Sequence, residues 1–280
     1  MNPFPILYLM AAAVAPAPPA DELPANLRPE YVLMADSADY FIAREIWPEA
    51  KRCTLAALRS DPGNFNNSLL LSNLGIINQH LGLSDEAIKN FTLGLDIAPR
   101  STTLRINRAR AYLDAGQYEN ARADLVAIIE TEPRHPWALK MLGTIELADR
   151  HPDRAQGYLS KIEKPDPDTL RLLAAIASEG GDTLRAREIL DRLLSESPSA
   201  ESYFDHALFC IQTSDIDTAK ADIADGIKMY PREGNLILLR AYIHSLMHEN
   251  ELATLDKKLA MEYGADKEWV DILFPDKRKR

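Results

Sequence analysis

Two pairs of metal-ligand side chains lie near the C-terminal end of the sequence. His206 and Cys210 are four residues apart, and so are His244 and His248. Residues four apart lie on the same side of an α-helix, so each pair could offer two ligands to one ion. Zinc accepts imidazole and thiolate in such a set. A buried thiol and a hydrogen-bonded imidazole would explain the same residues without metal, and we favour that interpretation, so no metal or other cofactor is predicted.

Motifs that carry catalysis are missing from the chain. It contains no G-x-S-x-G, no phosphate-binding glycine loop, no H-E-x-x-H and no dinucleotide fingerprint, each of which places reactive groups at a fixed spacing. The sequence therefore predicts a protein that is not an enzyme and has no catalytic residues.

Charge and cysteine content narrow the class of partner. The 280 residues carry a formal net charge of −10, with 46% hydrophobic and 26% charged residues, which is the composition of a globular protein. Nucleic-acid affinity depends on Lys and Arg that neutralise phosphates, so an acidic chain is a poor nucleic-acid binder. Two cysteines without a C-x-x-C spacing support neither a zinc knuckle nor a disulfide scaffold. A protein partner remains the favoured class.

The N-terminus has the layout of a secretory signal peptide. An apolar stretch from Phe4 to Val14 is followed by small residues and prolines, although no Lys or Arg precedes Arg28. We expect a signal-peptide-like leader over residues 1–20, a linker over 21–30, and export to the periplasm. A leader on a cytoplasmic protein is the alternative. The apolar stretch is shorter than the ~20 residues of a spanning helix, so the processed protein is not expected to span a membrane.

A unit of about 34 residues repeats along the chain. GQYENARADLVAIIETEP (116–133) matches GLSDEAIKNFTLGLDIAP (82–99), with Ala in the same place and Pro twelve residues later. A seventh copy keeps Ala253 without the proline. The spacing of twelve occurs six times, as Ala50 with Pro62, Ala87 with Pro99, Ala121 with Pro133, Ala155 with Pro167, Ala186 with Pro198, and Ala219 with Pro231.

A second small residue stands twelve positions before each of these alanines. Two columns of small residues per repeat are typical of paired helices that cross where their backbones approach closely. Ala121, Leu125, Ile128 and Ile129 follow helical spacing, and strand patterns are absent. The second column consists of Ala38, Gly75, Ala109, Gly143, Ala174, Ala207 and Ala241.

These residues resemble the tetratricopeptide repeat family. The matching features are the Leu-Gly pairs at 74–75 and 142–143, Tyr112, Phe91, the Ala column and the terminal prolines. The resemblance covers residues 31–265 and implies an all-α, right-handed superhelical solenoid of about seven helix pairs. Residues 266–280 are expected to form a C-terminal cap with a basic tail. Irregular steps of 37 and 31 residues predict three extra loop residues at 65–67 and a trimmed loop at 164–167.

Two charged residues fall in positions that the helical pattern predicts to face inward. Arg108 and Glu146 lie on first helices of consecutive repeats. Because a buried charge normally has a partner, we expect an ion pair between them, with a surface position for both as the alternative.

The family resemblance also implies where a partner binds. Members bind protein or peptide clients along a concave groove lined by their first helices, so we predict a non-enzymatic interaction scaffold. The alternative is an accessory or regulatory subunit of a larger envelope assembly that uses its convex face and ends. Packing between repeats or against the cap is the alternative role of the aromatic candidates. The sequence names neither client nor oligomeric state. The predicted contact residues are Trp137, Phe204, Tyr242, Lys140, Arg110, Arg171 and Ile76.

Overall fold

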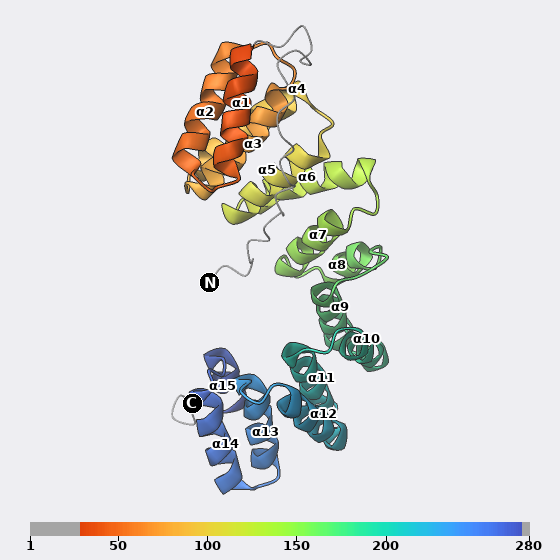
Figure 1. Cartoon of the computed structure of the whole chain (residues 1–280). Coiled ribbons are helices and arrows are strands. Elements are labelled where there is room, and N and C mark those ends of the chain that lie inside the picture. The colour runs from red at the N-terminus through yellow and green to blue at the C-terminus, as the bar shows by residue number, and fades with distance from the viewer. Residues whose placement is uncertain (1–28, 276–280) are drawn as a thin grey trace. The chain divides into compact units, whose positions relative to one another are not determined.

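The computed structural model describes residues 29–275 and consists of helices joined by short turns (Figure 1). The predicted leader, all of the linker except residues 29 and 30, and the basic end of the tail from Lys277 lie outside the described residues. Fifteen helices and no strand occur between residues 29 and 275, so the predicted all-α fold class is confirmed.

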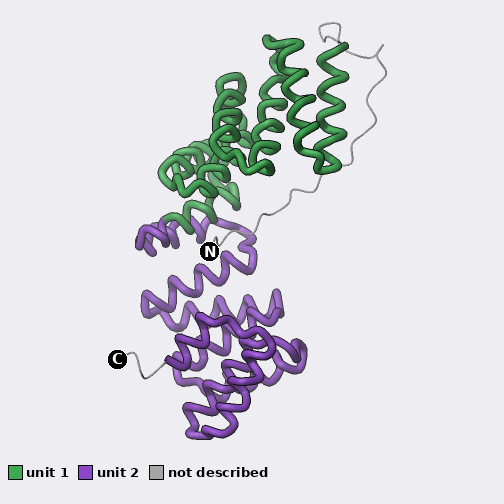
Figure 2. The backbone as a smooth tube through the Cα atoms, turned by 90° about the vertical axis from the view of Figure 1, so that its left-hand side faces the viewer, with its two compact units in different colours: residues 1–145 green, residues 146–280 purple. Residues whose placement is uncertain are grey.

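The helices fall into two compact units, residues 1–145 and 146–280 (Figure 2). The boundary between the units falls within helix α7 (Pro136–Ala148). The first unit holds α1 (Pro29–Ile42), α2 (Trp47–Ser60), α3 (Asn67–His80), α4 (Ser84–Ile97), α5 (Thr102–Asp114), α6 (Tyr118–Thr131) and most of α7. The second holds α8 (Pro152–Leu159), α9 (Pro167–Glu179), α10 (Thr183–Glu196), α11 (Ala200–Gln212), α12 (Ile216–Met229), α13 (Gly234–Leu246), α14 (Asn250–Glu262) and α15 (Lys267–Leu273).

Small residues sit where paired helices approach each other. Helices α1 to α14 correspond to the first and second helices of seven predicted repeats, and the small residues of both columns are buried. At Gly75 an added Cβ atom would overlap the ring of Phe91, the fully buried residue of the facing helix α4. The close approach of α3 and α4 therefore requires glycine at this position.

The turns inside each helix pair share one backbone feature. The residue five positions before the second-helix alanine adopts a left-handed conformation in all seven turns, with φ between 57° and 78°. Glycine adopts this conformation without strain, whereas other residues lose about 1 kcal/mol. The position is Gly82, Gly116 and Gly181 in three repeats and Glu45, Arg150, Ser214 and His248 in the other four.

The 31-residue step has a different cause from the predicted trimmed loop. Helix α8 has 8 residues, whereas the other second helices have 13 or 14, and residues 160–166 form a longer connection. Pro165 disfavours helical backbone at the residue before it, so the second helix cannot continue to its usual length. The prediction was wrong: the helix is shortened and not the loop. The extra residues of the 37-residue step do lie at the end of the loop before α3, and the last of them, Asn67, is the first residue of that helix.

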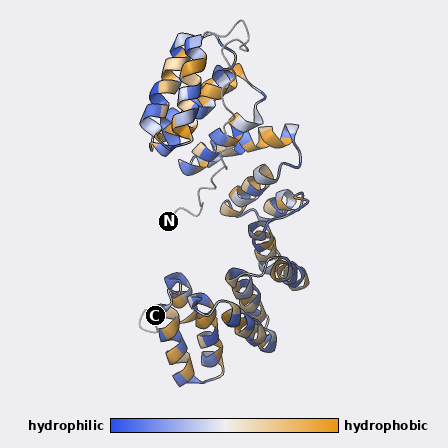
Figure 3. Cartoon of the chain, in the orientation of Figure 1, coloured by the Kyte–Doolittle hydropathy of each residue, from blue (hydrophilic) through white to orange (hydrophobic). Residues whose placement is uncertain are grey.

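Hydrophobic residues line the sides of the helices that pack together (Figure 3). One cluster in the second unit joins α9 to α13 through residues such as Leu193, Phe209 and Leu239, and α15 packs against it. None of the helices between residues 29 and 275 combines the length and the apolar character that crossing a membrane requires.

Candidate functional site

Polar side chains connect successive first helices in the first unit. Asn73 of α3 donates a hydrogen bond to Asp39 of α1 over 3.2 Å, and Asn107 of α5 donates one to Ser72 of α3 over 3.3 Å. We call the side of the odd-numbered helices on which the predicted contact residues lie the first-helix face. In the first unit it is lined by polar groups that contact each other between repeats.

Two predicted contact residues meet on this face. The guanidinium carbon of Arg110, on α5, lies 5.0 Å from the ring centroid of Trp137, on α7, and both side chains are half-buried. A cation over an indole ring is stabilised by the quadrupole of the ring. The structure therefore brings together one aromatic and one cationic residue of the predicted contact set.

Arg110 is only partly compensated by negative charge. Burial lowers the pKa of its guanidinium, and the opposing effect of Asp114, one turn further along α5, is smaller. Burial likewise raises the pKa of the Asp114 carboxyl, which Arg110 counteracts only in part. Within residues 29–275, no carboxylate forms an ion pair with Arg110. The site retains the capacity to accept an anionic group from outside.

The other two predicted residues of this unit have different surroundings. Ile76 is half-buried and packs against the cluster around Phe91 and Leu104. Lys140 is also half-buried, one turn along α7 from Trp137, and its backbone carbonyl accepts a hydrogen bond from Thr144. Lys140 thus lies on the same helix as Trp137.

In the second unit the predicted contact residue Arg171 is surrounded by acidic residues. Arg171 forms ion pairs with Asp205 at 2.7 Å, Glu201 at 2.8 Å and Asp168 at 3.3 Å. Burial alone would lower the pKa of Arg171, but its hydrogen bond to Asp205 and the charges of the three carboxylates raise it. Asp205 itself shares this single cation with two other anions, and its burial raises its carboxyl pKa. Arg171 is thus satisfied by its own chain.

The aromatic candidates of the second unit lie beside the C-terminal helix. Phe204 is 6% exposed and meets Trp269 of α15 edge to face, with ring centroids 5.0 Å apart. Tyr242 is half-buried and meets Phe274, just after α15, at 6.0 Å. Both rings therefore pack against the C-terminal cap, which was the alternative role expected for the aromatic candidates.

A repeated ion pair was missed by the sequence analysis. Arg108 donates two hydrogen bonds to Asp124 at 2.7 and 2.8 Å, and Arg240 donates two to Asp256 at the same distances. Each basic residue directly precedes the first small residue of its repeat, and each Asp follows the second small residue by three. A column-by-column reading for charge would have revealed the pair. The predicted ion pair between Arg108 and Glu146 was wrong, because Arg108 pairs with Asp124. Oε2 of Glu146 lies instead 3.4 Å from Nδ1 of His151.

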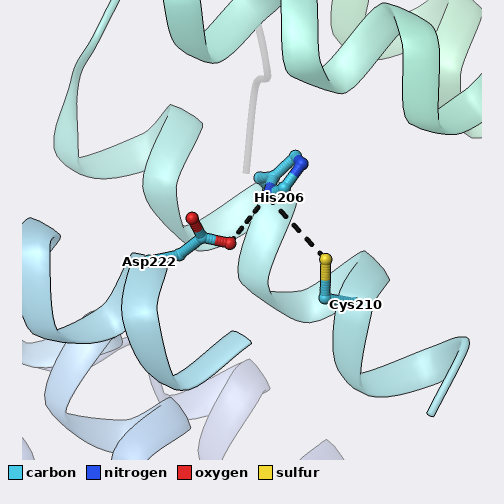
Figure 4. Close-up of side chains that lie close together, drawn as sticks. All are labelled: His206, Cys210 and Asp222. Carbon is cyan, nitrogen blue, oxygen red and sulfur yellow. Dashed lines mark hydrogen bonds and ion pairs between the residues drawn. The ribbon is translucent and has the colours of Figure 1, made fainter. Parts of the chain in front are cut away.

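The sixth repeat holds a histidine at this position. His206 Nδ1 lies 2.6 Å from Oδ2 of Asp222, and its Nε2 lies 2.8 Å from Oδ1 of Asp191. The sulfur of Cys210 lies 3.8 Å from Nδ1 (Figure 4). The hydrogen bond to Asp222, followed by that to Cys210, raises the pKa of His206 to about 10.

The two histidines of the seventh repeat do not join this cluster. His244 contacts Glu249 and Asp256, and His248 is the exposed left-handed residue of its turn. The four-residue set considered from the sequence is therefore not assembled, but its first pair gains a carboxylate from α12.

Comparisons with known proteins agree with the helical repeat. A family model described as tetratricopeptide repeat matches residues 112–179. Human DnaJ homolog subfamily C member 7 is 32% identical over 95 residues, which are 34% of this chain and 18% of the human protein. The matched region thus spans less than a fifth of that relative.

Solved structures match over most of the chain. A tetratricopeptide repeat protein from Parabacteroides merdae is 27% identical and has a TM-score of 0.64, with 87% of this chain and 97% of that chain covered. The C-terminal part of a repeat-containing protein from Cytophaga hutchinsonii is 17% identical and has a TM-score of 0.66, with coverages of 84% and 97%. The second likeness concerns the fold alone.

Proposed function

We propose that this chain is a non-enzymatic tetratricopeptide repeat scaffold that binds a partner protein or peptide on the first-helix face of its first unit. The partner segment that fits this face carries a carboxylate next to an apolar side chain. The carboxylate pairs with Arg110, and the apolar side chain packs on Trp137.

The observation that supports this proposal is the incomplete compensation of Arg110 beside a half-buried Trp137. A partner carboxylate would supply the charge that Asp114 supplies only in part. Aromatic and arginine side chains dominate binding energies at interfaces, because they bury large areas and form directed hydrogen bonds.

An affinity pull-down from the native cell, followed by mass spectrometry, tests the proposal. We expect a Trp137→Ala, Arg110→Ala variant to lose one specific protein that the wild type captures. With the isolated partner, the dissociation constant is expected to rise about 30-fold or more, which corresponds to a hot spot of about 2 kcal/mol.

A matched control is Arg59→Ala, which removes the same charge from an exposed position on the second helix α2 of the same unit. This variant is expected to keep the partner. If the double variant is folded by circular dichroism and still binds every partner as tightly as Arg59→Ala does, the first-helix face is not the binding surface.

A second function is favoured by two exposed leucines on α14. Leu252 is 48% exposed and Leu255 is 63% exposed, and they are spaced three apart on a second helix. Apolar side chains on this side of the helix suit an accessory subunit that assembles through its outer face and end. Loss of a partner from Leu252→Glu, Leu255→Glu protein, with retention in the Trp137→Ala, Arg110→Ala variant, would establish this alternative.

Export to the periplasm remains our proposal for the location. Its support is the signal-like pattern of residues 1–20. N-terminal sequencing of the protein from its native cell tests it, and a mature chain that begins at Met1 would contradict a cleaved leader.

A further inference from the structure

We propose that His206, Cys210 and Asp222 form a binding site for a thiolate-preferring divalent metal ion such as Zn²⁺. The ligand atoms are Nδ1 of His206, Sγ of Cys210 and a carboxylate oxygen of Asp222, which all lie within 4.8 Å of one another. The site is independent of the proposed scaffold function, since all three residues lie in the second unit.

The distances suit a tetrahedral ion after a small adjustment. Zinc bonds of 2.0–2.3 Å place two ligand atoms about 3.3–3.7 Å apart. The sulfur of Cys210 already lies 3.8 Å from Nδ1. Asp222 lies at hydrogen-bond distance from Nδ1, 2.6 Å, so its carboxylate must withdraw by less than about 1 Å. The Asp222 side chain is 14% exposed, so it is not fully enclosed.

A second carboxylate orients the imidazole ring. Nε2 of His206 faces Oδ1 of Asp191 at 2.8 Å. Metal-bound histidines usually donate their other ring N–H to a carboxylate, which fixes the tautomer and increases the basicity of the ligating nitrogen. With Nε2–H donated to Asp191, the lone pair of Nδ1 points at Cys210 and Asp222. Asp191 is largely exposed, so the site opens to solvent from the side of α10.

Comparison with the other repeats indicates that this arrangement differs from a simple ion pair. In the third and seventh repeats the basic residue is an arginine that bonds the equivalent Asp with two nitrogens and needs no further ligand. In the sixth repeat this position holds His206, a ring that can ligate, and a buried thiol stands one turn further on. In the third repeat, Tyr112 occupies the position of Cys210.

Coordination requires Nδ1 of His206 without its proton and Cys210 as the thiolate, so any protons on these two atoms pass to solvent, while the Nε2–H remains. The ion therefore has to form strong bonds to nitrogen and sulfur. Zn²⁺ and Co²⁺ meet this requirement, whereas Mg²⁺ prefers oxygen ligands.

Titration of the full, chelator-treated chain with Co²⁺ tests the proposal. We expect a thiolate-to-cobalt absorption band that saturates at one ion per chain, and displacement of Co²⁺ by Zn²⁺. Zn²⁺ is also expected to raise the melting temperature by several degrees, whereas Mg²⁺ leaves it unchanged.

The matched variant is His206→Arg, which recreates the Arg–Asp pair of the third and seventh repeats and is therefore expected to fold. It should lose both the cobalt band and the Zn²⁺-induced shift, as should Cys210→Ala. Cys53→Ala, which removes the other buried thiol, should retain both. The proposal is wrong if the wild type shows no thiolate band with Co²⁺, or if the band persists in His206→Arg.

Discussion

The first-helix faces of the two units differ in the partners that their arginine and aromatic side chains have within the chain. In the first unit, Arg110 lies over Trp137 with only partial compensation from Asp114. In the second unit, Arg171 is bound by three carboxylates, and Phe204 lies under Trp269. One face has unused capacity for an anion, and the other is occupied by side chains of the same chain.

This difference shows that a motif column alone does not define a binding residue. Arg110 and Arg171 were selected by the same family pattern, yet their guanidinium pKa values shift in opposite directions because only Arg171 has close anions. Binding energy is available where a charge or an aromatic surface lacks a partner in the free protein. The comparison therefore favours the first unit for the proposed partner binding, whereas Arg171 and Phe204 of the second unit are engaged within the chain.

Replacement of the two tryptophans should separate these roles most strongly. Trp269→Ala is expected to destabilise the second unit by about 3 kcal/mol, because it removes a half-buried ring from the cluster around Phe204. Trp137→Ala should cost less than about 1 kcal/mol, because Trp137 takes part in no comparable aromatic contact. Amide hydrogen exchange in α11 and α13, compared with that in α5, shows which unit loses stability in each variant. Equal losses from the two variants would remove the distinction between the two faces.

The repeated ion pairs offer a second comparison. Asp124→Ala should destabilise the first unit by about 2–3 kcal/mol, because Arg108 is 20% exposed and is left without its partner. Asp256→Ala should cost the second unit about 1–2 kcal/mol, because Arg240 is 39% exposed and water can replace the lost contact.

Urea unfolding followed by hydrogen exchange measures both losses. Arg108→Met combined with Asp124→Leu is the control, since removal of both charges should restore much of the stability. A larger loss from Asp256→Ala than from Asp124→Ala would contradict the ranking by burial.

The sequence predicted what depends on local spacing. The columns of small residues that include Ala121 and Ala109 predicted the helix pairs. The need for glycine at position 75, where a Cβ atom would overlap Phe91, follows from the same pattern. The shortened α8 was missed because the Ala155 to Pro167 spacing matched the other repeats, although Pro167 begins α9 instead of following a full-length helix.

The candidate site was less predictable, because compensation depends on contacts between repeats. The pairing of Arg171 with Asp205 joins residues 34 positions apart, and the position of Trp269 depends on how α15 packs back on α11 and α13. The partner of Arg108 was misassigned to the next repeat because inward position alone does not reveal which of several charges lies opposite. Asp124 is 16 positions away, a separation set by the turn between paired helices.

The pH dependence of stability tests whether Asp205 is one carboxylate more than Arg171 can compensate. Its folded pKa lies above the ordinary value of 3.8, so the folded state binds the proton more tightly than the unfolded chain. The resulting stabilisation is complete below about pH 3.8 and is lost as the pH rises through the folded pKa. Asp205→Asn, which has no such titration, should therefore gain stability relative to the wild type between about pH 3.5 and 7, by at most about 1 kcal/mol.

Melting curves at several pH values measure this difference, with Asp217→Asn, at an exposed position on the second helix α12, as the control for the loss of one carboxylate. A gain that is independent of pH would show that Asp205 is not strained by burial.

The turns provide the smallest and most local comparison between the units. Gly116 in the first unit and Ser214 in the second occupy the same left-handed position, with φ of 70° and 64°. Ser214→Gly should stabilise the second unit by about 0.5 kcal/mol, because glycine removes the strain but increases the entropy of the unfolded chain. Gly116→Ser should destabilise the first unit by about 1 kcal/mol, and no atom within 4 Å would obstruct the added Cβ, so the loss reports backbone strain alone. Urea unfolding of both variants measures the two changes in stability. A loss of stability in Ser214→Gly would show that the serine side chain stabilises its turn by more than the strain costs.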